Sequence, residues 1–177
     1  EKKVGKNILL ENIPNEMEFK NIFKSRSSNS TTKKTSSSQN PSSSRYSKRA
    51  KIIGDRCEEI VLKYLEKKLS GKIKSQLRWV ADEKEKPGWD IEYKDEKNNL
   101  ICVEVKGTGG DNFYNFELTE RERLAALKHK ENYKVYLVSK CFEKKPCIEI
   151  LPDFNKFVES KEVLLQPIRY RVTKDQK

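Results

Sequence analysis

The sequence is short of the residues on which several common active sites depend. Among 177 residues there is one histidine, His129, so a Ser-His-Asp triad or a cysteine-protease pair has little support. The sequence holds no glycine-rich loop of the GxxxxGK[ST] kind, and we therefore expect no ATP site. No two of the four cysteines form a CxxC pair. With a single histidine, this makes a zinc site a poor candidate.

Long apolar runs are missing as well. No stretch approaches the roughly 18–20 apolar residues that a membrane helix requires, and the first residues lack the apolar segment of a signal peptide. We therefore expect an intracellular protein, cytoplasmic or nuclear, with no membrane partner and with reduced cysteines. A disulfide between Cys141 and Cys147, which flank a turn, is the weaker alternative. The four cysteines are Cys57, Cys102, Cys141 and Cys147.

Positive charge is in excess and unevenly distributed. The chain has 38 Lys and Arg against 27 Asp and Glu, a net charge of +11, and residues 1–49 carry 11 of the basic residues but 4 of the acidic ones. A basic excess favours a polyanionic partner, either nucleic acid or an acidic membrane surface. A solubilising tail explains the charge of residues 1–49 equally well.

The composition divides the chain into three parts. Residues 1–24 mix short apolar pieces with charges, which predicts the end of a preceding region or a short segment that docks on something. Residues 25–47 are rich in serine and almost free of aliphatic side chains, and we expect a flexible linker there. Residues 48–177 form the expected domain. Because the sequence starts with Glu1 and not with methionine, we expect it to be a module of a larger parent protein.

Within residues 48–177 the pattern predicts an α/β fold, a sheet with helices packed on it. Thr119 with Glu122 three residues later matches a capping box, and Asp153 is the expected cap of a short helix. Pro167 makes the last strand an edge strand. The expected helices cover 48–69, 119–129 and 153–158, and the expected strands cover 74–81, 89–93, 100–106, 134–140, 147–151 and 164–172.

The hairpin formed by residues 87–106 is the predicted functional centre. It places Asp90 at the start of one strand, and Glu104 and Lys106 on one face near the end of the next. Phosphodiester hydrolysis needs oxygen ligands for Mg²⁺ or Mn²⁺, together with stabilisation of the charge that develops on the phosphoryl group. We expect Asp90, Glu104 and the Val105 carbonyl to bind the metal, and Lys106 to orient water or stabilise charge.

A simpler interpretation competes with this one. In a chain with 37% charged residues an Asp followed by Glu-x-Lys arises easily by chance. A Glu104–Lys106 pair at the margin of the sheet would also explain the burial of Glu104. Function is favoured because the strands are apolar apart from these residues, the acids lie at matched ends, and a glycine-rich loop follows Lys106.

Four motifs in this order resemble a known family. The resemblance is to the C-terminal domain of NO VEIN proteins, a family of unknown function assigned to the PD-(D/E)xK nuclease superfamily, and it covers residues of about 50–140. Trp89 departs from the superfamily pattern, which has proline there. The motifs are Gly54-x-x-x-Glu58 with Val61, Gly88-Trp89-Asp90-Ile91, Val103-Glu104-Val105-Lys106-Gly107-Thr108 and Phe116-x-Leu118-Thr119-x-x-Glu122.

The resemblance implies a restriction-endonuclease-like core, with a mixed central sheet flanked by helices. It implies that Asp90 and Glu104 bind Mg²⁺, that Lys106 assists catalysis, and that Glu58 completes the metal environment, often through water. Capping accounts for Thr119 and Glu122 without a catalytic role.

Three functions are therefore considered. The first is a Mg²⁺-dependent nuclease acting on DNA, for which a homodimer would allow both strands to be cut. The second is an inactive module of the same fold that binds nucleic acid or a partner protein, and the third is a structural domain of the parent protein. The expected nucleic-acid contacts are Lys48, Arg49, Lys51, Lys74, Arg78 and Thr108.

Overall fold

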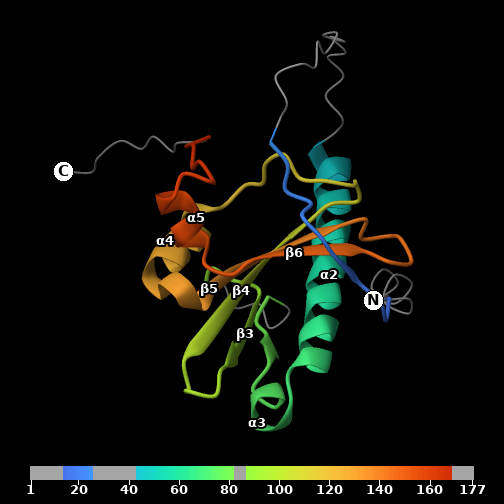
Figure 1. The fold of residues 1–177 in the computed structure, drawn as a ribbon. Coiled ribbons are helices and arrows are strands. Elements are labelled where there is room, and N and C mark those ends of the chain that lie inside the picture. The colour runs from blue at the N-terminus through green and yellow to red at the C-terminus, as the bar shows by residue number, and fades with distance from the viewer. Residues whose placement is uncertain (1–13, 26–42, 82–86, 169–177) are drawn as a thin grey trace, which may run out of the picture.

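A six-stranded mixed sheet with helices on both sides forms the protein, which confirms the α/β class. The computed structural model describes residues 14–25, 43–81 and 87–168 (Figure 1). The helices are α2 (Ser43–Lys68), α3 (Gly71–Lys74), α4 (Glu120–His129) and α5 (Phe154–Glu159), and η1 (Lys130–Asn132) is a 3-10 turn. The strands are β1 (Glu18–Phe19), β2 (Arg78–Trp79), β3 (Ile91–Lys94), β4 (Leu100–Gly107), β5 (Tyr133–Ser139) and β6 (Cys147–Leu151).

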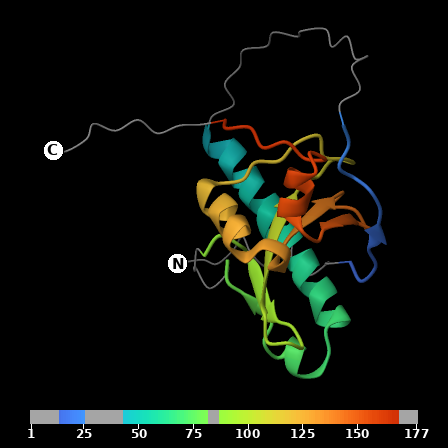
Figure 2. The same cartoon turned by 60° about the vertical axis from the view of Figure 1, so that its left-hand side comes forward.

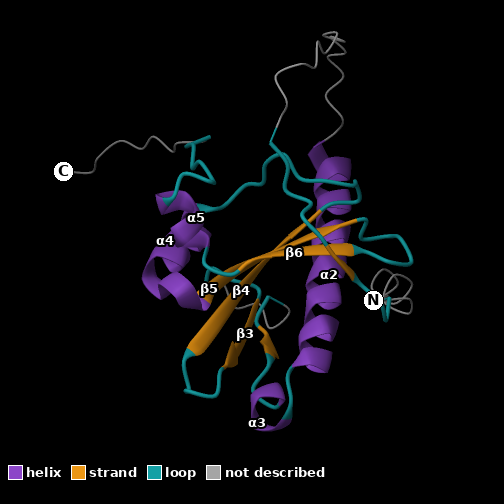
Figure 3. Ribbon diagram, in the orientation of Figure 1, coloured by secondary structure: helices purple, strands orange, loops and turns teal. Residues whose placement is uncertain are grey.

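The strand order places β4 and β5 in the middle of the sheet. The order is β1-β6-β5-β4-β3-β2. Figure 3 shows the strands in orange, with β3, β4, β5 and β6 labelled. Strands β4 and β5 are parallel and are joined through helix α4, whereas β3 pairs with β4, and β5 with β6, in antiparallel fashion. No helix in the described residues is long and apolar enough to cross a membrane.

Each face of the sheet has its own apolar core. Helix α2 covers one face, and α4 and α5 lie on the other, as the two views in Figures 1 and 2 show. Along β4, Ile101, Val103 and Val105 pack towards α2, whereas Leu100 and Cys102 pack on the side of α4. This alternation confirms the predicted strand faces, and it places Glu104 and Lys106 on the α4 side.

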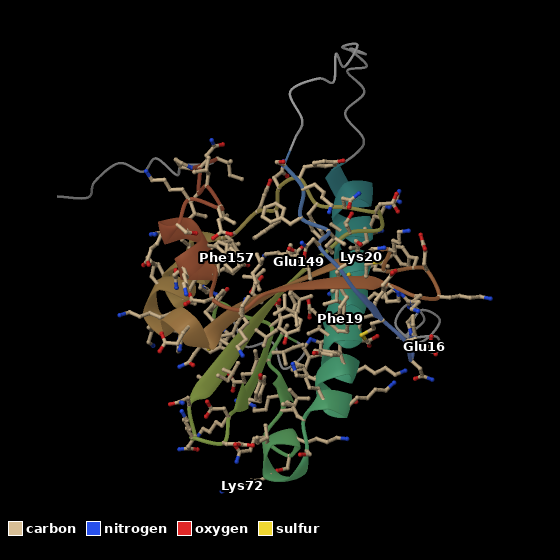
Figure 4. All side chains as sticks on the ribbon, viewed as in Figure 1. Glu16, Phe19, Lys20, Lys72, Glu149 and Phe157 are labelled. Carbon is tan, nitrogen blue, oxygen red and sulfur yellow. The ribbon has the colours of Figure 1, made fainter. Side chains whose placement is uncertain are left out.

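The segment 14–25 is part of this sheet. Strand β1 pairs in parallel with β6, and Ile22 is fully buried in the core on the α4 side. The carboxylate of Glu149 on β6 accepts hydrogen bonds from the backbone N–H groups of Ile22 at 2.6 Å and Phe23 at 2.7 Å (Figure 4). Of the two alternatives for residues 1–24, residues 14–24 thus fit the docking segment, which packs on this domain itself, whereas residues 1–13 lie outside the described residues.

The hairpin between β3 and β4 is closed by an aspartate. Asp95 Oδ1 accepts hydrogen bonds from the backbone N–H groups of Lys97 and Asn99, at 2.9 and 2.8 Å. Asn98 adopts the left-handed conformation with φ of 65°, which asparagine tolerates better than most residues. The predicted hairpin is confirmed, with its strands shifted by one or two residues.

Other predictions are met in part. Helix α4 has the predicted capping box, and the Asp153 side chain caps α5. All four cysteines are free and buried, so the alternative Cys141–Cys147 disulfide is not formed. The first helix begins at Ser43, five residues before the predicted start at 48.

Two predicted strands are wrong in extent. The predicted strand 74–81 is shorter in the structure. Residues 71–74 form the short helix α3, and β2 consists of Arg78–Trp79, the two positions at which β3 pairs with it. Residues 164–168 of the predicted strand 164–172 are exposed and not in a strand, and 169–172 lie outside the described residues. Pro167 has no backbone N–H to donate to a neighbouring strand, which explains why this segment does not extend the sheet.

Replacing Gly88 by alanine is expected to destabilise the fold strongly. Gly88 has φ of 108°, and an added Cβ would lie 2.8 Å from the Arg121 carbonyl oxygen and 2.9 Å from Ala125 Cβ on α4. We expect Gly88→Ala to lower the free energy of unfolding by about 2–6 kcal/mol, as strain and overpacking add. Urea unfolding followed by circular dichroism measures this loss.

Gly71→Ala is the matched control. Gly71 also has positive φ, at 54°, but an added Cβ there meets nothing within 4 Å. Its loss should be limited to about 1–2 kcal/mol of backbone strain. Equal losses in the two variants would contradict the close packing of α4 against the residue that leads into Asp90.

Candidate functional site

Asp90 lies directly before β3, next to the end of β4 that carries Glu104. The ladder between β3 and β4 ends with Ile91 paired to Val103. Asp90 N–H donates to the Val103 carbonyl at 3.0 Å, and Asp90 Oδ2 accepts from the Val105 N–H at 2.8 Å. Asp90 thus binds the N–H of the residue after Glu104, and its charge acts on the pKa of Glu104. The two carboxylates therefore lie together at the margin of the sheet.

Glu104 and Lys106 form a buried ion pair. Glu104 is 3% exposed, and its Oε1 lies 2.6 Å from Lys106 Nζ. Lys106 Nζ also lies 2.8 Å from Glu122 Oε2. The lysine is thus held between one carboxylate on its own strand and one on α4. This is the Glu–Lys pair that the simpler interpretation of the sequence predicts, and it adjoins Asp90.

Glu122 is the site residue that the sequence interpretation assigned to capping alone. Its Oε2 accepts a hydrogen bond from the Thr119 backbone N–H at 2.9 Å, completing the capping box, and also contacts Lys106. One carboxylate oxygen thus fixes both the first turn of α4 and the lysine. The motif Phe116-x-Leu118-Thr119-x-x-Glu122 was the available signal, but local sequence could not show where α4 would pack.

Glu58 reaches the site from the other helix. It lies on α2, where its Oε2 accepts a hydrogen bond from Trp79 Nε1 at 2.7 Å. The negative charge of Glu58 raises the pKa of Asp90, whereas the negative charges that raise the pKa of Glu104 are those of Asp90 and Glu122. Glu58 is therefore close to Asp90.

Burial and like charge together make the two central acids weak acids. Burial, followed by the charge of Glu58, raises the pKa of Asp90 to about 7 from an ordinary value of 3.8, although the Val105 N–H opposes this. Burial and then Asp90 raise the pKa of Glu104 well above its ordinary value, although Lys106 lowers it. Both carboxyl groups therefore bind a proton more readily than an exposed carboxyl group does.

The pKa of Lys106 shifts in the opposite sense to that of a simple buried lysine. Burial alone lowers the pKa of an ammonium group, but Glu104 and Glu122 together outweigh it and raise the pKa of Lys106 above its ordinary value. Lys106 therefore stays protonated at neutral pH. It acts as a fixed positive charge and a hydrogen-bond donor.

The oxygen donors at this margin suit a divalent cation. Val105 directs its N–H to Asp90, and in a strand the N–H and C=O of one residue point to the same side, so the Val105 carbonyl also faces Asp90. Two carboxylates and a carbonyl are the hard ligands that Mg²⁺ and Mn²⁺ accept. In the described residues no three His, Cys, Asp or Glu side chains are already arranged around a metal position. Binding would therefore require Glu104 to turn from Lys106, which Glu122 can retain.

The predicted nucleic-acid contacts do not form one patch. Lys48, Arg49 and Lys51 are exposed near the start of α2, and Lys51 pairs with Asp55 at 2.8 Å. Lys74 ends α3, beyond the other end of α2, and about 20 helical residues separate the two groups by about 30 Å (Figure 1). Arg78 pairs with Glu92 at 2.7 Å. Thr108 follows Lys106 by two residues and lines the same cavity as that lysine.

Stability of the metal-free protein should fall as pH rises through the range in which Asp90 titrates. An acid whose pKa is higher in the folded protein binds its proton more tightly there than in the unfolded chain. The free energy of unfolding should therefore decrease from about pH 4 to about pH 7, between the two pKa values of Asp90. Asp90→Asn removes this contribution and flattens the slope, although Glu104 still contributes with the same sign. Urea unfolding in EDTA at several pH values measures this dependence of the free energy of unfolding on pH.

The control for this experiment is Asp111→Asn. Asp111 is an exposed aspartate that pairs with Lys140 at 3.2 Å on the surface. This variant should keep the wild-type slope. A slope that Asp90→Asn leaves unchanged would show that the Asp90 carboxylate is not held in a buried, negatively charged environment.

The family comparison agrees with the resemblance described above. The family model "Protein NO VEIN, C-terminal" matches residues 57–151, more than half of the chain and the span from α2 to the end of β6. Searches of curated proteins and of solved structures found no match. Asp90, Glu104, Lys106 and Glu122 all lie within the matched residues. The chain belongs to the NO VEIN C-terminal family.

Proposed function

We propose that this chain is a Mg²⁺- or Mn²⁺-dependent nuclease domain that hydrolyses phosphodiester bonds of nucleic acid, with DNA as the expected substrate. The observation that carries the proposal is the proximity of Asp90 to Glu104 at the margin of the sheet, where Asp90 binds the Val105 N–H at 2.8 Å and Lys106 Nζ lies 2.6 Å from Glu104. Two buried like charges are costly unless a cation or proton neutralises them. A divalent metal relieves that cost and supplies the chemistry.

The order of elements supports a restriction-endonuclease-like core. Helix α2 is followed by β2, β3 and β4, then by α4 and the parallel strand β5. The acids come from adjoining ends of β3 and β4, and α2 contributes Glu58 on the far side. This is the arrangement expected for the PD-(D/E)xK superfamily, in which the strand hairpin carries the acids.

The roles follow from charge and position. A bound Mg²⁺ would neutralise the charge on the phosphoryl oxygens and lower the pKa of a bound water. Asp90, Glu104 and the Val105 carbonyl would hold it, and Lys106 would donate a hydrogen bond to the attacking water or to a phosphoryl oxygen. Glu122 keeps Lys106 in place when Glu104 turns to the metal. Glu58 adds negative charge next to Asp90 and can hold a water of the metal.

A second function is favoured by one observation. In the structure the Glu104 carboxylate is engaged by Lys106, and no three acidic or other ligand side chains in the described residues already surround a metal position. In a module of the same fold that binds nucleic acid or a partner protein without cutting, Glu104 would stay paired with Lys106 at all times. Its nucleic-acid binding would be sensitive to salt and would survive loss of the Glu104 charge.

Replacing either central acid should abolish metal binding and cleavage together. We expect Mn²⁺ to bind the wild type in calorimetric titration, and binding to be lost in Asp90→Asn and Glu104→Gln. Cleavage of plasmid and single-stranded DNA with Mg²⁺ should fall roughly a hundredfold or more, the usual cost of losing one group that stabilises developing charge. Circular dichroism of each variant verifies that it is folded.

Glu92→Gln is the matched control. Glu92 lies two residues after Asp90 on the same face of the hairpin, and it is engaged by Arg78 and Trp89 outside the cluster. Its variant should bind Mn²⁺ and cut DNA like the wild type. A folded wild type that neither binds Mn²⁺ nor cuts any nucleic acid would contradict the nuclease proposal. Retained, salt-sensitive binding in Glu104→Gln without any cutting by the wild type would establish the non-catalytic module.

A further inference from the structure

A cavity of about 380 Å³ opens beside the acid cluster, which consists of Asp90, Glu104 and Glu122 around Lys106. It lies under the loop that joins β4 to α4, and Lys106 belongs both to its wall and to the acid cluster. A volume of this size is at the lower end of the range of small-molecule sites. Its wall includes the polar residues Lys106, Thr108, Asn112, Asn115 and Glu117 and the aromatic residue Tyr114.

The loop over this cavity is fixed by contacts on its other side. The Phe113 N–H donates to the Ile22 carbonyl at 2.8 Å, and the Lys24 N–H donates to the Phe113 carbonyl at 2.7 Å. Phe116 packs against Phe23 with ring centroids 5.5 Å apart. The segment 14–25 therefore holds the loop in place, and Figures 1 and 2 both show the two segments side by side. The cavity wall is preformed.

Tyr114 in this loop is exposed, unlike its neighbour Phe113. Phe113 is buried, whereas the next residue, Tyr114, is 54% exposed although it is a large aromatic side chain. Aromatic side chains that present a face to solvent beside a basic residue provide stacking surfaces for nucleobases. The amides of Asn112 and Asn115 add donors and acceptors that can pair with the edge of a base.

The charges of the wall indicate which part of a nucleotide fits. Lys106 lies at the end shared with the acids, whereas Glu117 would repel a phosphate inside the cavity. A neutral base fits between them, and its phosphate would stay at the end of Lys106, where the proposed chemistry takes place. A base that is still paired in a duplex cannot leave the stack to enter a cavity without opening the pair.

We propose that this cavity receives one unpaired nucleobase adjacent to the phosphodiester that is cut, with Tyr114 as the stacking surface. This inference rests on the proposed function and specifies its substrate class: single-stranded nucleic acid, or a strand that is locally unpaired. Tyr114 is a specificity residue, and it takes no part in the metal site.

The test is binding without metal, so that it is independent of cleavage. Fluorescence anisotropy in EDTA gives the dissociation constants of a labelled single-stranded oligonucleotide and of the matching duplex for wild type, Tyr114→Ala and Tyr114→Phe. Loss of one stacked base costs about 1–3 kcal/mol, or roughly a five- to hundredfold weaker single-strand affinity for Tyr114→Ala. Tyr114→Phe keeps the ring and should stay within about threefold of the wild type. Duplex affinity should be unchanged in both.

Leu164→Ala provides the control. Leu164 is a large apolar side chain that is 72% exposed, lies in the segment after α5 and is not part of the cavity wall. Its variant should bind both oligonucleotides like the wild type. Unchanged single-strand affinity in Tyr114→Ala, or an equal loss for single strand and duplex, would overturn the inference.

The outcomes for the inference and for the nuclease proposal are separable. If the wild type cuts DNA with Mg²⁺ but Tyr114→Ala binds single strands normally, the base site is wrong and the nuclease stands. If single-strand binding depends on Tyr114 but nothing is cut, the base site stands and the nuclease is wrong. A wild type that binds no oligonucleotide in EDTA overturns the base site, whatever it cuts.

Discussion

The ammonium group of Lys106, held between two carboxylates from different elements, is the interaction on which the rest of the site depends. It joins β4 to α4 through Glu104 at 2.6 Å and Glu122 at 2.8 Å. Without it, Glu104 would be a buried charge with Asp90 as its neighbour, an arrangement that costs several kcal/mol in a protein interior. Lys106 also pairs with Glu122, so Glu104 can turn to a metal without leaving Lys106 unpaired. Structure and proposed chemistry thus depend on the same three charges.

Close packing on both sides of β4 sets the geometry of these charges. An added Cβ on Gly107 would clash with Cys57 Sγ, so α2 can approach the strand directly beyond Lys106 because Gly107 has no side chain. That approach brings the residue after Cys57, Glu58, near Asp90. On the other face, Tyr133 donates a hydrogen bond to the Gly88 carbonyl at 2.9 Å and holds the turn that leads into Asp90. Two helices and a central strand therefore position four carboxylates that come from distant parts of the sequence.

The sequence allowed the hairpin, its two faces and the capping box to be predicted, because each depends on residues that are near in the chain. The position of Glu122 beside Lys106 could not be predicted, since it depends on how α4 packs on the sheet. Strand β1 was missed for a similar reason: two residues pair with β6, and Glu149 fixes the chain next to them through backbone N–H groups that carry no sequence signal. The predicted strand over 164–172 was suggested by β-branched and aromatic residues, but residues 164–168 are exposed and lie outside the sheet, because Pro167 cannot donate to a neighbouring strand.

The central claim is that Asp90 and Glu104 form a site for a divalent cation. Diffraction from Mn²⁺-soaked crystals, recorded at the manganese absorption edge, tests it most directly. We expect an anomalous peak about 2.0–2.4 Å from carboxylate oxygens of both residues, the range of distances for hard divalent cations, with Lys106 still paired to Glu122. Anomalous peaks elsewhere on the molecule, or none, with Glu104 still paired to Lys106, would contradict the claim and leave the cluster as a structural ion pair.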